Sequence, residues 1–446
     1  MVINMEQNTQ SQQDRREIRR KRRIRNQVLA YATVLIFIIA IATGIVFGVR
    51  YLTGESRKRE QEKQDQVNQL LETEESLPDP EPEPEPSEEV AELTPEEKLD
   101  QIVNAGIEVM PLEDKVAGLF IVTPESITGV STAVRAGDGT KDALTKYAVG
   151  GVIYNTKNIQ SETQFRDMID NTKLYANYPL FIAIEDEGGN ISPLGEKGLV
   201  TRQDNAKAVA EGGDANRAYE VGGVMGAYLT DYGFNLNFAP VSDLNSVDGS
   251  VMANRAYGSD AAQVSPYVAA MVRGLKEQDI NVCLKHFPGM GSTSQDTDKG
   301  LASTDRSAQD FRDNEFTVFS AGIDAGADMV MVSHMAAPSL AGDNTPCSMS
   351  SAVVTDILRR ELHFNGVIIT DSMSVAAISD YYDAGDAAVQ ALRAGCDMIL
   401  MPEDFEKAYN GVLEAVRNGE ISEERINDSL RRVYRIKYAD RVETVE

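Results

Sequence analysis

Titratable and polar side chains follow short apolar runs at five points along the sequence. The set comprises Glu185, Asp186 and Glu187; Asn237 and Asp243; Lys285 and His286; Ser333 and His334; and Asp371. Carboxylates can act as nucleophiles and as general acids or bases, whereas lysine and histidine can donate hydrogen bonds to hydroxyl groups. The whole chain contains three histidines and three cysteines, which leaves little material for a His-rich or Cys-rich metal site. We therefore expect chemistry by carboxylates, with no metal and no other cofactor.

Eight apolar runs, separated by amphipathic stretches, must position these side chains. The runs are Gly118–Thr123, Gly150–Tyr154, Pro179–Ile184, Phe234–Phe238, Asn281–Leu284, Asp328–Val332, Gly366–Thr370 and Asp397–Met401. Short, continuously apolar runs are typical of strands that are buried on both faces. Eight strand–helix repeats predict an α/β fold, a (β/α)8 TIM-type barrel. The alternative is a doubly wound open sheet, but such a sheet usually has fewer strands, and no phosphate-binding glycine fingerprint follows the first run.

The carboxyl ends of the strands form one face of such a barrel, and active sites lie at that face. The polar set would then converge at a single mouth. Any one of these side chains could be structural, but the whole set at one face favours catalysis or ligand binding. Carboxylates beside groups that bind hydroxyls, without a metal-ligand cluster, favour glycoside hydrolysis.

The N-terminal part of the chain has a different composition. Residues 1–28 carry eight Arg and Lys side chains and predict a basic cytoplasmic tail. Leu29–Val49 follows, with 21 residues and no charge. A helix of that length is about 31 Å long, which matches the core of a bilayer. The basic flank predicts a single-pass signal anchor in the cell membrane, with the rest of the chain extracellular. A cleaved signal peptide and a buried core helix are the alternatives.

Residues 50–93 are polar and acidic, and Pro78–Glu89 reads PDPEPEPEPSEE. This composition predicts a disordered, extended, polyproline-like linker in front of a catalytic domain at residues 94–440. The net charge of −27 argues against nucleic acid as a partner, because phosphate binding requires a basic face. The sequence identifies no obligate protein partner.

Five ordered segments resemble those of a known family. Their sequences are KHFPGMG (Lys285–Gly291), IEDEGG (Ile184–Gly189), NFAPVSDLNS (Asn237–Ser246), NRAYG (Asn254–Gly258) and GVIITDSMSVAAI (Gly366–Ile378). Together they resemble glycoside hydrolase family 3, in particular the single-domain bacterial β-N-acetylglucosaminidases (β-N-acetylhexosaminidases) of peptidoglycan turnover. The resemblance covers residues 94–439 and implies a retaining, two-step hydrolysis.

The resemblance assigns roles to individual residues. Asp371 matches the nucleophile that forms a glycosyl-enzyme, and Lys285 would help to keep it ionised. Lys285 and His286 match residues that bind sugar hydroxyls, Arg255 matches the arginine that grips the substrate, and Glu185 lies in the substrate-binding acidic turn. The structural alternatives are a helix N-cap for Asp371 and a supporting role for His286.

The sequence departs from the family at the acid/base. Related enzymes place an Asp-x-His pair after the fifth strand, whereas this chain has Asp296 and Asp298. A lone aspartate ionises far below neutral pH, but two close carboxylates can suppress one another's ionisation. We hypothesise that Asp298, or the pair, acts as a coupled carboxylate acid/base. Met290 also stands where the family usually has histidine.

Three functions remain open from the sequence. The first is a membrane-anchored glycosidase that releases terminal β-N-acetylglucosamine from peptidoglycan fragments. The second is a β-glucosidase or β-xylosidase with the same chemistry. The third is a catalytically impaired barrel that binds cell-wall glycan, which the missing acid/base histidine favours and the retained Asp371 disfavours.

Overall fold

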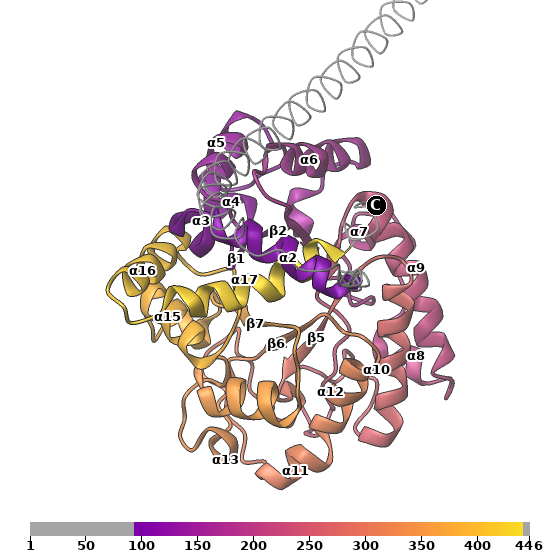
Figure 1. The fold of residues 1–446 in the computed structure, drawn as a ribbon. Helices are drawn as coiled ribbons and strands as arrows, with labels where there is room; N and C mark the ends of the chain where they lie inside the picture. Colours follow the sequence, from indigo (N-terminus) through magenta and orange to yellow (C-terminus); the bar gives the residue numbers. More distant parts are fainter. Residues whose placement is uncertain (1–92, 440–446) are drawn as a thin grey trace, which may run out of the picture. The chain divides into compact units, whose positions relative to one another are not determined.

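Eight parallel strands close into a barrel in sequence order, as the apolar runs predict. A computed structural model describes residues 93–439 (Figure 1). The strands are β1 (Phe120–Val122), β2 (Gly151–Ile153), β3 (Phe181–Ile184), β4 (Leu236–Asn237), β5 (Asn281–Phe287), β6 (Met329–Val332), β7 (Val367–Ser372) and β8 (Met398–Leu400). The prediction of a (β/α)8 barrel is confirmed, and the open-sheet alternative is wrong.

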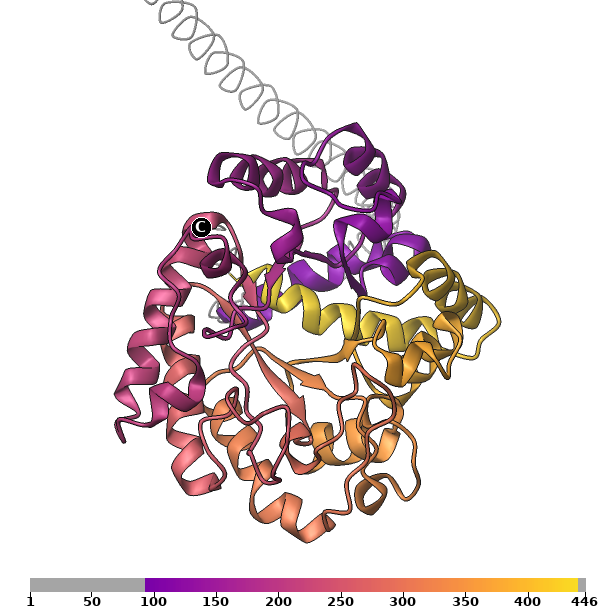
Figure 2. The same cartoon turned by 180° about the vertical axis from the view of Figure 1, so that it is seen from behind.

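Helices surround the barrel in both views of the ribbon (Figures 1 and 2). The α-helices are α2 (Pro95–Glu108), α3 (Leu112–Ala117), α4 (Pro124–Thr128), α5 (Asp138–Lys146), α6 (Glu162–Tyr175), α7 (Pro193–Glu196), α8 (Ala206–Ala210), α9 (Asn216–Tyr232), α10 (Ala261–Lys276), α11 (Ala308–Asp313), α12 (Glu315–Asp324), α13 (Pro338–Ala341), α14 (Ala376–Ser379), α15 (Ala384–Ala394), α16 (Phe405–Arg417) and α17 (Glu423–Lys437). Short 3-10 helices occur at η1 (Thr156–Asn158), η2 (Met290–Ser292) and η3 (Cys347–Met349), and a π-helix occurs at η4 (Ala352–Glu361).

Strands β5 and β7 continue beyond the apolar runs into polar residues. The register of β5 against β6 shifts between Leu284 and Phe287, and that of β7 against β8 shifts between Ile369 and Ser372. Such irregularities bend a strand and re-aim its side chains, and they are common beside active sites. Both irregular segments carry candidate site residues.

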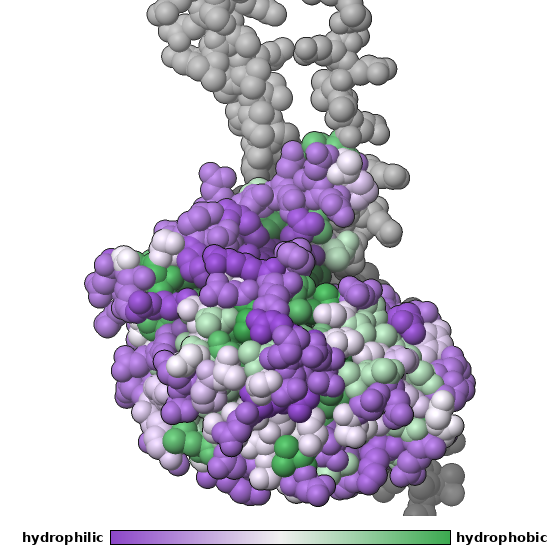
Figure 3. All heavy atoms as spheres, turned by 90° about the horizontal axis from the view of Figure 1, so that it is seen from below, coloured by the Kyte–Doolittle hydropathy of each residue, from purple (hydrophilic) through white to green (hydrophobic). Residues whose placement is uncertain are grey.

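Apolar side chains form two cores, one inside the barrel and one between the strands and helices. In β3, Phe181 and Ala183 belong to the inner core, whereas Ile182 and Ile184 belong to the outer one. This period of two is the alternation expected of barrel strands. Hydrophilic residues predominate on the face shown in Figure 3, with hydrophobic residues in smaller patches between them.

The last helix closes one end of the barrel. Val433 of α17 belongs to the inner core, and Ile436 packs against it. The next residue, Lys437, lies over the ring of Phe181, the first residue of β3, and donates to the carbonyl oxygen of Gly150, just before β2, so α17 covers the amino ends of these strands. The candidate site lies at the opposite end, where the strands terminate.

The predicted tail (1–28), the predicted membrane span (29–49) and all but the last residue of the predicted linker (50–93) lie outside the described residues. Within residues 93–439, no helix combines the length and the apolar character needed to cross a membrane.

Candidate active site

A cavity of about 340 Å³ opens at the carboxyl ends of the barrel strands. Its charged and imidazole side chains are Glu185, Arg255, His286, Asp296, Asp298 and Asp371. Most of the remaining wall is apolar, and part of it belongs to the inner core. Ligand pockets are commonly of this size or larger. The cavity brings together six of the seven predicted site residues, and the seventh, Lys285, does not line it.

Strand alternation aims three of the predicted residues inward. Because Phe181 and Ala183 face the barrel interior, Glu185, two residues further on, faces inward as well. The same period places Lys285 two residues after the inward-facing Cys283, and Asp371 two residues after the inward-facing Ile369. The sequence already contained this signal, since the period of two can be counted from the apolar run.

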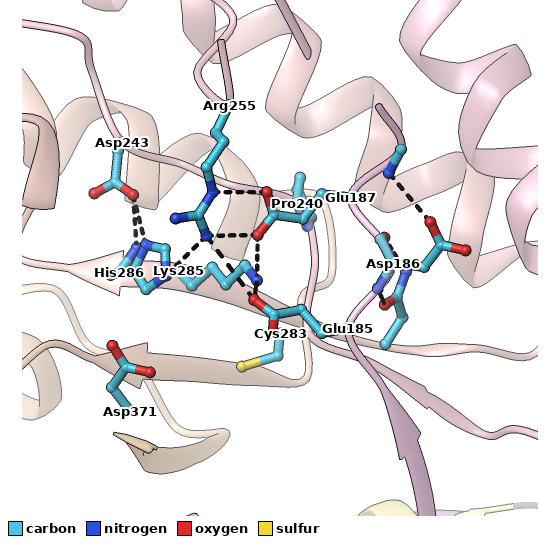
Figure 4. Close-up of polar contacts among 12 residues, drawn as sticks. Glu185, Asp186, Glu187, Pro240, Asp243, Arg255, Cys283, Lys285, His286 and Asp371 are labelled. Atoms are coloured by element: carbon cyan, nitrogen blue, oxygen red, sulfur yellow. Dashed lines mark hydrogen bonds and ion pairs between the residues drawn. The ribbon is translucent and has the colours of Figure 1, made fainter. Parts of the chain in front are cut away.

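An ion-pair network stands beside the cavity (Figure 4). Arg255 donates from Nε and Nη2 to the two carboxylate oxygens of Glu187, over 2.9 and 2.6 Å. Lys285 is fully buried, and its ammonium bonds Glu185 and, over 2.5 Å, Glu187. Burial alone would raise the pKa of Glu187, but Lys285 and Arg255 together hold it below its usual range. Glu187 is therefore a buried, ionised anchor for both cations.

The orientation of Lys285 differs most from the expectation that this side chain binds a sugar hydroxyl and keeps Asp371 ionised. Its ammonium is directed at the two glutamates rather than into the cavity, and Figure 4 draws no contact between it and Asp371. Burial lowers the pKa of Lys285, but Glu185 and Glu187 outweigh burial and raise it. Lys285 thus supports Glu185, which does line the cavity.

His286 is oriented by Asp243. Its Nδ1 lies 2.7 Å from Asp243 Oδ2, and its backbone N–H donates to the same oxygen over 3.2 Å. The backbone N–H of Met290 donates to the other oxygen of Asp243 over 2.6 Å. A carboxylate only accepts, so Nδ1 carries the hydrogen and Nε2 lies free to accept from a donor such as Arg255, 3.5 Å away. Sequence analysis placed Asp243 at the mouth but did not identify this pairing.

Asp371 lies in the irregular end of β7 and is half-buried. Its Oδ1 accepts from the backbone N–H of Ser372 over 2.8 Å. No other hydrogen bond or ion pair of its carboxylate is formed within the described part of the chain, so Oδ2 faces no competing donor. Asp371 belongs to a strand and not to a helix start, so its N-cap alternative is wrong.

Asp296 and Asp298 lie on the loop that follows η2, and both line the cavity. Partial burial raises the pKa of Asp298, and the negative charges of Asp371 and Asp296 raise it further. Asp296 accepts from the backbone N–H of Asp298 over 3.1 Å and pairs with Lys299 over 3.0 Å. Asp298 is thus the carboxyl of the cavity whose surroundings favour the protonated form.

Hydrogen bonds to Asp186 fix the turn that carries Glu185 and Glu187. Asn237 exchanges two hydrogen bonds of 2.9 Å with the backbone of Asp186. The hydroxyl of Tyr228 donates to the Asp186 carboxylate over 2.8 Å, and burial raises the pKa of Asp186 to about 6. Asp186 and Asn237, both in the predicted polar set, therefore hold the turn and do not line the cavity.

The fold and the cavity together define a class of protein. Carboxylates that converge on a small cavity at the mouth of a (β/α)8 barrel are typical of glycosidases. Among residues 93–439, no group of three or more His, Cys, Asp or Glu side chains is arranged to hold a metal ion.

The chain belongs to glycosyl hydrolase family 3. The family model described as "Glycosyl hydrolase family 3 N terminal domain" matches residues 95–436. A β-hexosaminidase of Stenotrophomonas maltophilia (strain R551-3) is 33% identical over 287 residues, which cover 61% of this chain and 82% of that protein. β-Hexosaminidase A of Pseudoalteromonas piscicida is 28% identical over 327 residues, covering 66% of this chain and 54% of that longer relative.

A solved structure agrees with these sequence matches. The structure of a glycoside hydrolase family 3 β-N-acetylglucosaminidase from Paenibacillus sp. str. FPU-7 superposes with a TM-score of 0.70 at 33% sequence identity. The match covers 75% of this chain and 64% of that chain. The family membership that the five motifs predict is confirmed.

Proposed function

We propose that this chain is a retaining β-N-acetylhexosaminidase that releases terminal β-linked N-acetylglucosamine. The observation that carries the proposal is the meeting of Asp371 and Asp298 in one cavity with Glu185, Arg255 and His286. The relatives named β-hexosaminidase and the Paenibacillus β-N-acetylglucosaminidase support this choice of sugar.

In the first step, Asp371 Oδ2 attacks the anomeric carbon of the sugar. The bond from that carbon to the leaving oxygen breaks, and Asp298 transfers its proton to this oxygen. The product is a glycosyl ester on Asp371 and an alcohol that departs. The hydrogen bond from Ser372 to Oδ1 orients the carboxylate for the attack.

In the second step, water attacks the same carbon. Asp298, now ionised, accepts a proton from that water, and the ester bond to Asp371 breaks. Asp371 returns to its ionised state and Asp298 to its protonated state. Partial burial, then the charges of Asp371 and Asp296, raise the pKa of Asp298, which suits a group that must donate a proton and then accept one.

Sugar hydroxyls are bound by Glu185, Arg255 and His286, which line the cavity. Lys285 acts through Glu185, and Glu187 acts through Arg255, because their charged atoms are engaged with these partners. Asp243 keeps the hydrogen of His286 on Nδ1 and so leaves Nε2 as an acceptor for a hydroxyl.

Covalent labelling tests the proposal. Full-length protein is incubated with 5-fluoro-N-acetylglucosaminyl fluoride, in which the ring fluorine slows both steps while the good leaving group lets the first proceed. We expect the intact mass to rise by one sugar, with the label on the peptide that contains Asp371. An unlabelled protein, or a label elsewhere, would refute the assignment.

Two other candidate functions can be distinguished from the proposed one by the substrates that the protein cleaves or binds. Aryl β-N-acetylglucosaminide, β-glucoside and β-xyloside are compared at equal concentration, and a preference for either of the last two would replace the proposed sugar. The presence of Asp298 where relatives have histidine favours the third candidate, a glycan-binding barrel without turnover. Binding of chitobiose without its cleavage would establish that candidate.

We also propose that the enzyme is anchored in the cell membrane by Leu29–Val49, with its N-terminus cytoplasmic, and acts on peptidoglycan fragments outside. The support is the basic flank and the uncharged stretch of 21 residues. Protease added to intact cells should remove the catalytic domain from the membrane fraction. A domain that stays protected until the cells are lysed would argue against this orientation.

A further inference from the structure

A histidine that takes no part in the proposed mechanism lies buried beside Asp371. His334 follows β6 closely, and only 1% of its surface is exposed. Its Nδ1 lies 2.7 Å from Ser348 Oγ, and its Nε2 lies 3.0 Å from the carbonyl oxygen of Ser372. Since Ser372 directly follows Asp371, His334 contacts the backbone that carries the candidate nucleophile.

The partners of the ring fix the position of its proton. A carbonyl oxygen only accepts, so Nε2 carries the hydrogen and donates to Ser372. In the neutral ring, Nδ1 then accepts from the hydroxyl of Ser348. Burial lowers the pKa of His334, while the charge of Asp371 and the backbone carbonyls of Ser372 and Asp371 act in the opposite direction with smaller effect. The geometry and the burial both correspond to a neutral ring with both nitrogens satisfied.

Ser372 lies beyond the part of β7 that pairs with β6. The pairing of β6 with β7 ends at Val332 and Thr370, and the register of β7 against β8 shifts just before Ser372. His334 supplies the hydrogen bond that a neighbouring strand gives elsewhere in a parallel sheet. The amide of Ser372 in turn donates to Asp371 Oδ1 over 2.8 Å. Ser348 thus anchors His334, His334 anchors the carbonyl of Ser372, and the amide of the same Ser372 holds the carboxylate.

We propose that His334, whose ring is anchored at Nδ1 by Ser348, is a positioning residue that fixes Asp371 through the backbone of Ser372. The inference rests on the proposed role of Asp371 as nucleophile. A neutral ring suits this role, because Nε2 donates to the carbonyl of Ser372 while Nδ1 accepts from the hydroxyl of Ser348. Anchoring of Ser372 also explains why a half-buried carboxylate at an irregular strand end keeps one oxygen oriented.

Four variants of the full-length protein test the proposal. His334→Gln retains an N–H that can reach the Ser372 carbonyl, whereas His334→Leu fills the space without a donor. Ser348→Ala removes the hydroxyl that bonds Nδ1 of the ring and holds the ring in place. Thr355→Val is the matched control, because Thr355 donates one side-chain hydrogen bond, to Ala394 O over 2.7 Å, on a helix outside the cavity lining.

Each variant is measured for the rate of covalent labelling by the fluorinated inactivator and for inhibition by free N-acetylglucosamine. We expect His334→Leu to slow labelling by about 100-fold, the loss that a small misplacement of a reacting group produces. His334→Gln should recover to within about tenfold of the parent, and Ser348→Ala should lie between the two. The inhibition constant of the sugar should change by less than about threefold in all variants, and Thr355→Val should label at the parent rate.

Equal labelling rates in His334→Leu, His334→Gln and the parent would overturn the proposal. So would a fall in labelling that Thr355→Val shares, since that would reflect general destabilisation. If His334→Leu fails to fold, as judged by its thermal transition, Ser348→Ala decides: an unchanged labelling rate overturns the proposal. A parent protein that is never labelled at Asp371 refutes the proposed function instead, so the two failures are distinguishable.

Discussion

Lys285 and Glu187 form an ion pair of 2.5 Å between two side chains that are almost completely removed from water. The ammonium of Lys285 has no exposed surface, and 6% of the Glu187 side chain is exposed. Burying two charges is expensive, and only close pairing with further hydrogen bonds offsets the cost. Arg255 and Glu185 supply those bonds here. In this arrangement, stability and the proposed substrate binding depend on the same few atoms.

Glu187→Gln should therefore destabilise the fold. The change leaves Lys285 and Arg255 with one carboxylate between them, and breaking a buried pair typically costs about 3 kcal/mol. Urea denaturation at neutral pH measures the loss in free energy of unfolding. Glu420→Gln, which breaks an exposed pair with Arg393, is the control and should cost less than about 1 kcal/mol. Equal losses in the two variants would contradict the prediction.

The same pair predicts an acid-sensitive stability. The pKa of Glu187 is lower in the folded protein than in the unfolded chain, so its contribution is present in full above about pH 4.5. The contribution is lost progressively as the pH falls below that value toward the depressed pKa. Denaturation midpoints between pH 7 and pH 3 should fall more steeply for the parent than for Glu187→Gln. Parallel curves would argue against an ionised Glu187.

Asp371→Gly should reduce turnover of an aryl β-N-acetylglucosaminide by about 10⁴-fold or more, because no group remains to attack the anomeric carbon. Sodium azide should restore activity, since the small anion can occupy the vacated space and attack in place of the carboxylate. The product should then be the α-glycosyl azide, of inverted configuration, identifiable by NMR. Restoration of activity without that product would remove Asp371 from the proposed role.

The Asp298→Asn variant tests the proposed acid independently of the proposed nucleophile. A phenolic leaving group of low pKa departs without a proton, whereas the sugar hydroxyl of chitobiose needs one. We expect the first-step rate to fall by about 10²-fold to 10⁴-fold on chitobiose and by less than about tenfold on a dinitrophenyl glycoside. A variant that retains equal activity on both substrates would show that the proton comes from elsewhere.

Asp296→Asn should change the pH dependence more than the maximal rate. Partial burial, then the charges of Asp371 and Asp296, raise the pKa of Asp298. Because the acid works in its protonated form, kcat/KM on chitobiose should decline as the pH rises through that raised pKa. Removing the charge of Asp296 lowers the pKa of Asp298, so the alkaline limb should move to lower pH. A limb that stays in place would mean that the two carboxylates are not coupled.

Sequence patterns predicted the strands well but not the contacts between distant side chains. All eight apolar runs became strands, because a continuously apolar segment has few other ways to bury itself. Helix boundaries were less predictable: between the third and fourth apolar runs, the amphipathic stretch Ala206–Tyr232 forms two helices, α8 and α9, with Gly212 and Gly213 in the interruption. The stretch Asp310–Ala325 is likewise divided, at Asn314, whose backbone leaves the helical region.

The sequence indicated which residues meet in the candidate site, but only some of the contacts that they form with one another. Strand ends supplied Glu185, His286 and Asp371, since the topology of a barrel brings those ends together. Lys285 bonds Glu185, 100 residues earlier in the chain, and no local pattern indicates which of several carboxylates a buried cation selects. The hydrogen bond from His334 to Ser372 forms beyond the point where β6 and β7 stop pairing, which the composition of the strands does not indicate.

The closure of the barrel by α17 has a consequence for biosynthesis. The last strand ends at Leu400, yet the inner core includes Val433, and the side chain of Arg431 reaches back to Asn104 in α2, the first described helix. Until the final helix has emerged from the ribosome, one end of the barrel stays open to water and α2 lacks its neighbour. Completion of the barrel therefore waits for α17, and a chain stalled before that helix would present its unfinished interior to chaperones and proteases.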